Sequence, residues 1–381
     1  NIMLINKKNM LSAAVVMAGL VGTAGIAQAA PVTTTTVGGY VKFDSIYNQE
    51  NDTSGKLREQ ALLTLNGNES ADEEGDLYFS SYESRIKFTS QTTGTPIGDL
   101  KAVIEGDFYS GATQNIVNLR HAYFTQDNLT IGQTWSTFMD LSALPEKGDF
   151  GGAAARVFSR KSLVKYSTDI AGGKLDLAVE APVYKVAGQQ DAVTPDLIAK
   201  YTMKTGFGHI STGVLVQNVR VDNTTTDVDA DTAGDQFGTL DDAKIAVAAR
   251  VSGRVNFGKD NLKFAVIAGQ GLGGYLNFGD TATGAASTDG TKVELSDSLA
   301  TRVSFQHHWS STLRSNLVYG TTTADINGLD SGDYTSTHLN LIYAPYKAVK
   351  FGGEIINASK EVADSEDKKL SRLQVFAKYA F

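Results

Sequence analysis

An acidic run in the second half of the chain has residues that could bind a divalent cation. Asp227, Asp229 and Asp231 alternate in the segment DVDADTAGD, which is how an EF-hand calcium loop begins. Such a loop needs Gly at its sixth position and Glu at its twelfth, but Thr232 and Gly238 stand there. We therefore exclude an EF-hand, and we leave calcium binding by this acidic segment open against a solvated loop.

Histidines and one His-Ser pair are the other residues with metal-binding or catalytic chemistry. The histidines have neither helical nor zinc-ligand spacing, so the sequence predicts no metal site and no cofactor. The five histidines are His121, His209, His307, His308 and His338. Ser211 follows His209 by two residues, and this pair is the best candidate for nucleophilic catalysis, in which a histidine activates a serine hydroxyl.

Charged side chains at alternate positions offer a different chemistry, which is the selection of ions along a wall. In residues 244–257, Lys244, Arg250 and Arg254 share one set of alternate positions, and apolar residues such as Val251 occupy the other. A period of two places the sets on opposite faces of a β-strand. The same alternation recurs along the chain, so the sequence predicts an all-β fold.

The strands are numerous enough to close a barrel. Sixteen segments alternate when the stretch around Arg120 is included, and a bacterial barrel needs an even number. Short connections such as TQDN, TGFG and GKDN alternate with long polar ones. The long connections include residues 48–77, 136–156, 221–241 and 272–297. This asymmetry is typical of outer-membrane barrels, which have short periplasmic turns and long external loops, so we expect the first and last strands to pair.

Composition excludes several classes of protein. The 381 residues include no Cys, 38 Gly and 6 Pro, which excludes a disulfide scaffold, a Cys-ligated metal site and a Pro-rich disordered chain. The formal net charge is −8, which argues against nucleic acid as a partner.

The first 29 residues have the parts of a secretory signal peptide. Lys7 and Lys8 precede an apolar run over residues 11–26, and small residues surround the expected cleavage point after Ala29. A membrane-anchoring helix is the alternative, but glycines interrupt the run and a span needs about 20 residues. We expect export to the bacterial outer membrane, with residues 30–381 as a single barrel domain that crosses the membrane by strands.

A soluble β-sandwich or lipocalin-like barrel also alternates, but the polar face here carries Lys and Arg on strand after strand. A soluble core cannot bury so many charges, whereas a transmembrane barrel turns them toward a water-filled lumen. The last residues, LQVFAKYAF, resemble the terminal signal that the barrel-assembly machinery recognises, with Phe381 at its end. The predicted fold is a 16-stranded antiparallel transmembrane β-barrel.

In such a barrel, His209 and Ser211 point into the lumen while Ile210 and Thr212 face lipid. Their spacing resembles that of outer-membrane phospholipases, but a lipid hydrolase needs the pair on the lipid side. The Asn-Gly of the phospholipase motif does not follow either. We therefore predict that the protein is not an enzyme.

Several segments resemble the DcaP-like trimeric porins of Gram-negative outer membranes. They are GGYVKFDSIYN at 38–48, SRIKFTSQT at 84–92, LKAVIEGDF at 100–108 and LRHAYFTQDNLTIGQTWSTFMDLSALPEKGDFGG at 119–152, with weaker similarity in GQGLGGYL at 269–276. The resemblance implies a 16-stranded barrel that is usually a homotrimer. It also implies passage of small anionic solutes, with dicarboxylates as the substrate class attached to the family name.

Residues 136–156 form the third long connection, where trimeric porins fold a loop into the barrel. We expect this inward-folded loop to carry the constriction acids Asp140, Glu146 and Asp149. A loop lined with carboxylates requires a facing basic wall. The candidates for that wall are Arg85, Lys87, Arg120, Lys161 and Lys165. Further basic residues on predicted lumen faces are Arg250, Arg254, Arg302, Arg314 and Arg372.

Predicted lumen bases outnumber lumen acids outside the loop, and rings of Arg and Lys favour anions. The sequence therefore predicts an outer-membrane porin for passive uptake of small hydrophilic solutes, in particular anions such as dicarboxylates. The loop acids oppose this preference, so a weakly selective general diffusion porin is the alternative. Two less favoured alternatives are a non-conducting structural barrel and a barrel that hydrolyses lipid. Other expected partners are outer-membrane lipid and lipopolysaccharide, to which the acidic residues 222–242 could bridge through divalent ions.

Overall fold

A computed structural model describes residues 30–51, 75–109, 117–182, 194–222, 241–276, 284–286, 292–326, 329–362 and 367–381. The first strands are β1 (Val32–Asn51), β2 (Asp76–Ser80), β3 (Arg85–Thr93), β4 (Leu100–Asp107), β5 (Asn118–Gln126), β6 (Leu129–Trp135), β7 (Arg160–Ile170), β8 (Gly173–Glu180), β9 (Asp196–Thr205) and β10 (Gly208–Asp222). They are followed by β11 (Asp241–Phe257), β12 (Asp260–Gln270), β13 (Gly284–Ala286), β14 (Val293–Leu295), β15 (Asp297–His308), β16 (Leu313–Ile326), β17 (Leu329–Tyr346), β18 (Val349–Val362) and β19 (Lys368–Ala380).

Two 3-10 helices lie in the connections of the described part of the chain. They are η2 (Leu141–Ala143), between β6 and β7, and η3 (Leu272–Gly274), which follows β12. None of the described segments is a helix long and apolar enough to span a membrane.

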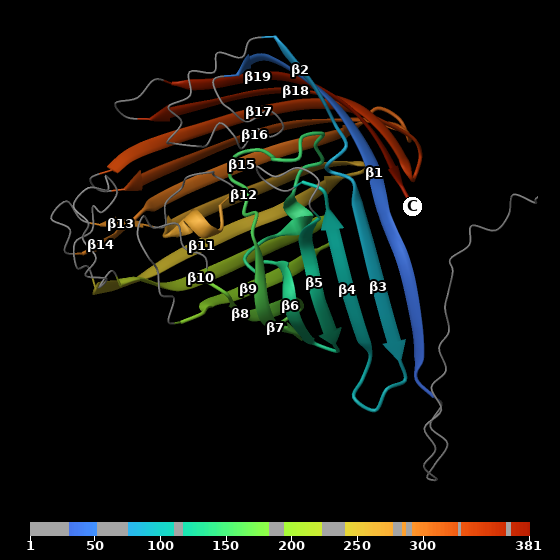
Figure 1. The fold of residues 1–381 in the computed structure, drawn as a ribbon, viewed down its shortest axis with the longest axis vertical. Coiled ribbons are helices and arrows are strands. Elements are labelled where there is room, and N and C mark those ends of the chain that lie inside the picture. Colours follow the sequence, from blue (N-terminus) through green and yellow to red (C-terminus); the bar gives the residue numbers. More distant parts are fainter. Residues whose placement is uncertain are drawn as a thin grey trace, which may run out of the picture.

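The strands close into one antiparallel barrel (Figure 1). Strands that follow one another in the chain pair with each other, and β19 pairs with β1 from Tyr40–Ala380 to Asn51–Leu370. Both β2 and β3 pair with β1, end to end, so they are two halves of one barrel strand that is interrupted at residues 81–84. β13 and β14 form a separate hairpin. The barrel therefore has sixteen strands, which confirms the predicted fold class.

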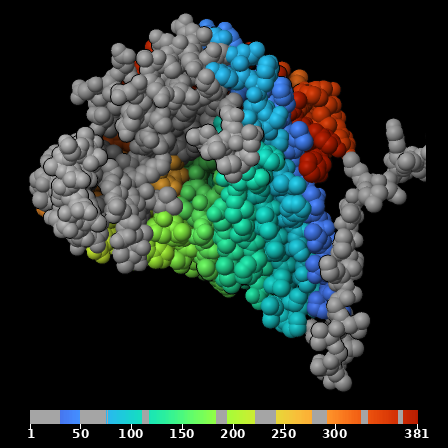
Figure 2. Space-filling view, viewed as in Figure 1, coloured from blue at the N-terminus to red at the C-terminus, as the bar shows by residue number. Residues whose placement is uncertain are grey.

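The outward face of the barrel is apolar, as the alternation predicts. On β11, Val247 and Val251 are 48% and 45% exposed, whereas Ala248 and Arg250 are 1% and 2% exposed. A soluble barrel would have the opposite arrangement, with valines inside and arginine outside. One side of this wall, from β1 in blue through the teal and green strands, is a continuous packed surface in Figure 2.

The apolar core lies inside the barrel, between the wall and two connections. Phe138 and Val157 of the β6–β7 connection and Tyr275 after η3 are buried in one cluster with Ala248 and Ile267 of the wall. The wall residues alternate with exposed ones, so the cluster is on the lumen side.

The two connections are also joined to each other. Val157 forms an isolated antiparallel bridge with Leu276, and the Phe158 N–H donates to the Tyr275 carbonyl at 2.9 Å. The packed connections fill the part of the lumen that lies beside wall residues such as Ala178 of β8, Ala248 of β11 and Ala300 of β15.

Candidate functional site

Two consecutive residues of β5 point into the barrel because the strand contains a bulge. The register between β4 and β5 shifts between Glu105 and Gly106, so Arg120 is the extra residue on β5. Arg120 and His121 are 1% and 7% exposed, while Leu119 is 48% exposed. The bulge explains why the segment RHAYF does not alternate cleanly, and it brings a guanidinium group to the lumen face.

Guanidinium groups and aromatic rings alternate along the lumen side of β3–β7. The Arg85 Cζ lies 5.1 Å from the centre of the Tyr40 ring and 5.8 Å from that of Phe150. The Arg120 Cζ lies 5.7 Å from the Phe150 centre and 5.6 Å from that of Trp135. These distances are within the range of cation–π attraction.

The series continues at the end of the β6–β7 connection. The Arg160 Cζ lies 5.1 Å from the ring centre of Trp135 and 5.8 Å from that of Phe158. Arg156 stacks on Phe158 at 3.6 Å and also donates to the carbonyls of the loop itself. We call this series the arginine stack. It comprises Arg85, Arg120, Arg156 and Arg160 with Tyr40, Trp135, Phe150 and Phe158.

The carboxylates near the arginine stack engage two of its guanidinium groups. Arg120 binds Asp107 at 2.6 Å and Glu105 at 3.1 Å, and Glu105 also lies 3.7 Å from Arg85. Arg160 has no ion pair among the described residues, and its buried Nη1 has no hydrogen-bond partner there. The rings cover guanidinium faces, and Arg85 Nε also has no hydrogen-bond partner among the described residues, so Arg85 can still donate to an oxyanion.

Glu146, the second of the three loop acids, pairs with bases on β16 and β18. Arg314 on β16 donates to Glu146 through Nε at 2.6 Å and Nη2 at 2.7 Å, and Lys350 on β18 donates at 2.7 Å. Burial raises the pKa of Glu146, but the hydrogen bonds and charges of these two bases outweigh burial and lower the pKa to about 2. Glu146 is therefore an ionised anchor of the loop.

Asp140 is held by the barrel wall at β10 and β11. Its Oδ2 atom lies 2.9 Å from His209 Nε2 on β10 and accepts from the Ser252 hydroxyl on β11 at 2.7 Å. Burial raises the pKa of Asp140, but these hydrogen bonds and the charge of Arg250 bring it below its usual value.

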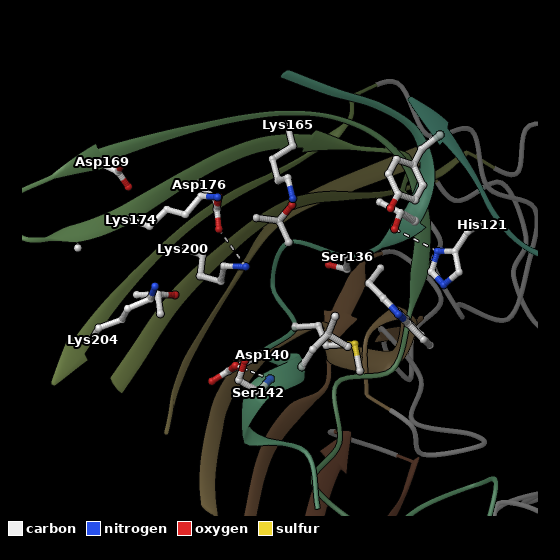
Figure 3. Close-up of a pocket in the computed structure, with 18 of the residues that line it drawn as sticks. His121, Ser136, Asp140, Ser142, Lys165, Asp169, Lys174, Asp176, Lys200 and Lys204 are labelled. Atoms are coloured by element: carbon white, nitrogen blue, oxygen red, sulfur yellow. Dashed lines mark hydrogen bonds and ion pairs between the residues drawn. The ribbon is translucent and has the colours of Figure 1, made fainter. Parts of the chain in front are cut away.

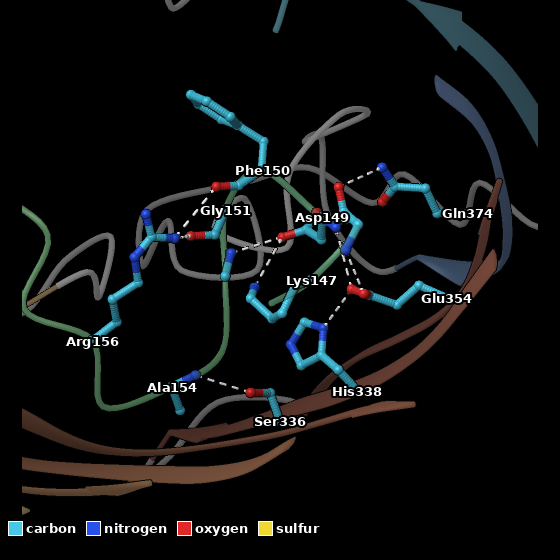
Figure 4. A network of polar contacts seen from close by, with 12 residues as sticks. Lys147, Asp149, Phe150, Gly151, Ala154, Arg156, Ser336, His338, Glu354 and Gln374 are labelled. Carbon is cyan, nitrogen blue, oxygen red and sulfur yellow. Dashed lines mark hydrogen bonds and ion pairs between the residues drawn. The ribbon is translucent and has the colours of Figure 1, made fainter. Parts of the chain in front are cut away.

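The third acid, Asp149, lies in a buried polar network (Figure 4). Asp149 is 3.9 Å from Lys147 and 3.7 Å from Arg372 of β19, and it accepts from the Gly152 N–H at 2.7 Å. Burial raises its pKa, but the two cations lower it below the usual range. Glu354 of β18 accepts from the N–H groups of Gly148 and Asp149 at 2.5 and 3.2 Å, which fixes the loop backbone.

Other predicted lumen bases cap loop carbonyls. Arg250 donates from Nε to the Phe138 carbonyl at 2.7 Å, and Arg302 donates from Nη1 to the Ala155 carbonyl at 2.7 Å. Both side chains are almost fully buried. They hold the loop in place, and Arg302 also borders the smaller cavity.

Lys161 is buried beneath the second connection. Its Nζ atom lies 4.3 Å from the centre of the Tyr275 ring, and the Tyr275 hydroxyl donates to Asp196 at 2.7 Å. Burial raises the pKa of Tyr275 above its usual range, and the charges of Glu180 and Asp196 raise it further, so the hydroxyl stays protonated. The weak similarity at GQGLGGYL was the only sequence signal for this cluster.

Two cavities along β3–β9 define the candidate path. The larger, about 900 Å³, extends from Arg85 past η2 to the β7–β8 turn, with lysines of β7, β8 and β9 on its wall (Figure 3). The smaller, about 170 Å³, is lined by the bases Arg85, Lys147 and Arg156 and by the acids Glu83 and Asp149. Because Arg85 lines both cavities, they meet at the arginine stack.

The structure separates the predicted basic wall into two groups. Arg85, Lys87 and Lys165 line the larger cavity, whereas Arg120 and Lys161 are buried behind it. Arg254 donates to Asn256 and lines neither cavity, and Arg314 and Arg372 contact loop acids. Sequence reasoning missed Arg156 and Arg160, and it missed Lys174, Lys200 and Lys204, which alternation does place on lumen faces.

The residues weighed for enzyme and metal chemistry are arranged differently. His209 binds Asp140, and the Ser211 hydroxyl accepts from Arg250 Nη2 at 3.0 Å. No three potential ligands cluster closely enough for a metal ion within the described ranges. The acidic residues Asp227, Asp229 and Asp231 lie outside those ranges.

A closed antiparallel barrel with an apolar outer face and a polar, partly filled lumen is the architecture of outer-membrane porins. A model of the DcaP outer membrane protein family matches residues 5–381, and the chain belongs to this family. The predicted resemblance is thereby confirmed, and with it an outer-membrane location. Comparison with curated proteins gave no significant match.

Solved porin structures share the fold. The outer membrane channel DcaP of Acinetobacter baumannii has a TM-score of 0.77 at 23% identity, over 95% of this chain and 100% of that one. The anion-selective porin of Comamonas acidovorans has a TM-score of 0.60 at 13% identity, over 92% and 100%. The trimer form of OmpT of Vibrio cholerae has a TM-score of 0.58 at 14% identity, over 92% and 99%.

Proposed function

We propose that this protein is an anion-preferring porin that admits small carboxylates, dicarboxylates among them, past the arginine stack. One observation carries the proposal: each loop acid is already bound by bases or hydroxyls of the barrel wall, whereas Lys87 and Lys165 line the larger cavity without an ion pair among the described residues. Asp140, Glu146 and Asp149 are each paired with bases or hydroxyls of β10–β19. Asp140 and Asp149 line the cavities, but the bases that they already bind offset their charge, so they leave the other bases of the path uncancelled.

The chemistry of the stack suits carboxylates. A guanidinium edge forms two parallel hydrogen bonds to one carboxylate, which an ammonium group cannot do. Arg85 borders both cavities and Lys165 lines the larger one, so a solute with two carboxylates could engage both groups at once, and Arg160 adds its positive charge from within the stack. A dianion thereby gains more than a monoanion. This extends the role expected of Arg85 and Lys165 to residues that alternation did not identify.

The remaining expectations support the same proposal. The A. baumannii and C. acidovorans structures are described as a channel and an anion-selective porin, and one OmpT structure is described as a trimer. We extend these descriptions to a homotrimeric channel here. Cleavage after Ala29, recognition of Phe381 by the barrel-assembly machinery and contact with lipopolysaccharide belong to the same proposal. Passive diffusion through this channel requires no catalytic residue.

Planar-bilayer recording tests the function. The unmodified protein in a potassium chloride gradient should give a reversal potential that reports chloride preference, and succinate should block the current. Replacing Arg85 and Arg160 by Gln should reduce the preference and weaken the succinate block by about tenfold or more, since each lost charge-assisted hydrogen bond is worth ~1.5–3 kcal/mol.

Arg254→Gln is the matched control, because Arg254 lies outside the arginine stack, where it donates to Asn256, and borders neither cavity. Cation preference in the unmodified channel would overturn the proposal and favour a general diffusion porin. Absence of conductance would favour a structural barrel. An equal loss in the Arg254 variant would mean that total lumen charge, and not the arginine stack, sets selectivity.

A further inference from the structure

Four lysines descend along the lumen face of β7–β9 from the arginine stack to the short turns. On β8, Ala178 is paired with Lys165 and Asp176 is paired with Lys200, two residues closer to the turn. Lys174 follows after two more residues on β8, and Lys204 is four residues beyond Lys200 on β9. We call Lys165, Lys200, Lys174 and Lys204 the lysine track. All four line the larger cavity (Figure 3).

The lysine track has more positive than negative charge. Asp176 is 3.0 Å from Lys200 and accepts from the Ser167 hydroxyl at 2.6 Å. Lys165, Lys174 and Lys204 have no ion pair among the described residues. The other acids along this part of the cavity are the exposed Asp169, near the turn, and Asp140 of η2, which already binds His209.

We infer that the lysine track is a second anion site, separate from the arginine stack, that binds compact phosphate-bearing polyanions and blocks the path when occupied. An ammonium group is a point charge without the guanidinium fork, so a group of lysines favours high charge density over planar carboxylate shape. Successive lysines are about 7 Å apart along the strands, a spacing that a chain of two or three phosphates can follow. This inference rests on the proposed function in one respect: the barrel must conduct ions. It does not require the channel to prefer anions.

The position of the site predicts block from one side. The larger cavity is lined by the β7–β8 turn at residues 171–173, and Lys204 is next to the β9–β10 turn. A polyanion on the side of the short turns therefore reaches the lysine track directly. Arg85 lies at the other end of the larger cavity, so a polyanion from the opposite side meets the arginine stack before the lysine track.

The test is single-channel recording on the full-length trimer or monomer as isolated, with phosphate, pyrophosphate or tripolyphosphate added to one side at a time. Block should strengthen with the number of phosphates and be at least tenfold more effective from the side of the short turns. Lys174→Gln with Lys204→Gln should weaken that block by about tenfold, because two unpaired charges are lost. The succinate block and reversal potential should change far less, since Arg85 and Arg160 remain.

Lys259→Gln with Lys347→Gln is the matched control, because both are exposed lysines in other short turns. Heat-modifiable mobility on gels checks that all variants fold. Block that is equal from both sides, or that falls equally in the control variant, would overturn the lysine track as a site. If the reversal potential shows no anion preference but one-sided tripolyphosphate block persists, the proposed selectivity fails and the lysine track stands.

Discussion

Replacing the loop anchor Glu146 by Gln should release the β6–β7 connection from the β16–β18 wall. The pKa of Glu146 is lowered from 4.5 to about 2, which corresponds to roughly 3 kcal/mol in favour of the anchored, ionised state. Its side chain is 26% exposed, so solvent screening reduces this to about 2 kcal/mol. Loss of this energy should raise the population of a detached loop roughly thirtyfold.

The anchor also has a definite pH dependence. The pKa of Glu146 is lower in the folded state than in the unfolded state. The stabilisation is therefore complete above about pH 4.5 and is lost as the pH falls toward 2. The assay is the fraction of time that a single channel spends in substates or brief closures at pH 7 and during acidification. The unmodified channel should become noisy only in acid, whereas E146Q should be noisy at both pH values.

The matched control for Glu146 is Glu361→Gln, which removes one carboxylate from the exposed end of β18. It should leave the channel as quiet as the unmodified protein at pH 7. If E146Q is as quiet as the control and still shows the acid transition, Glu146 does not hold the loop, and the reasoning from its contacts with Arg314 and Lys350 is refuted.

Three further changes probe the packing inside the barrel. Arg250→Met should lower the unfolding free energy by ~2–4 kcal/mol, seen as a lower midpoint of heat-modifiability, because the Phe138 carbonyl loses its buried donor. Tyr275→Phe should cost ~1–3 kcal/mol in the same assay at every pH from 6 to 9, because the raised pKa keeps the hydroxyl a donor throughout; a loss confined to high pH would contradict this. Gly132→Ala should sharply reduce refolding yield, because Gly132 has φ +122° and a Cβ there would lie 2.3 Å from the Ala122 carbonyl, whereas Gly206→Ala, where φ is not positive and nothing lies within 4 Å of an added Cβ, should refold nearly normally.

The sequence by itself determined which side of each strand faces the membrane and how many strands close the barrel. Alternation is a local property: neighbouring residues of an extended chain point to opposite faces whatever the strand pairs with. Val251 and Arg250 were therefore assigned to opposite faces correctly without knowledge of the fold. The short turns TQDN, TGFG and GKDN also agree with the structure, because tight turns depend on nearby residues. Local geometry breaks the two-residue period at the β5 bulge and between β2 and β3. There the sequence did not predict which side chains face the lumen.

Only the tertiary structure decided what each charge does. Glu146 binds Arg314 and Lys350, which are 168 and 204 residues away, so its partners depend on how the barrel closes and how the loop crosses it. Alternation placed Lys165 and Lys161 on the same face, but Tyr275 from a distant connection covers Lys161 and leaves Lys165 in the cavity. The sign of a charged residue and the strand face on which it lies follow from the local sequence. Its burial and its ion pairs depend on residues that closure of the barrel brings together, and these residues are far apart in the sequence.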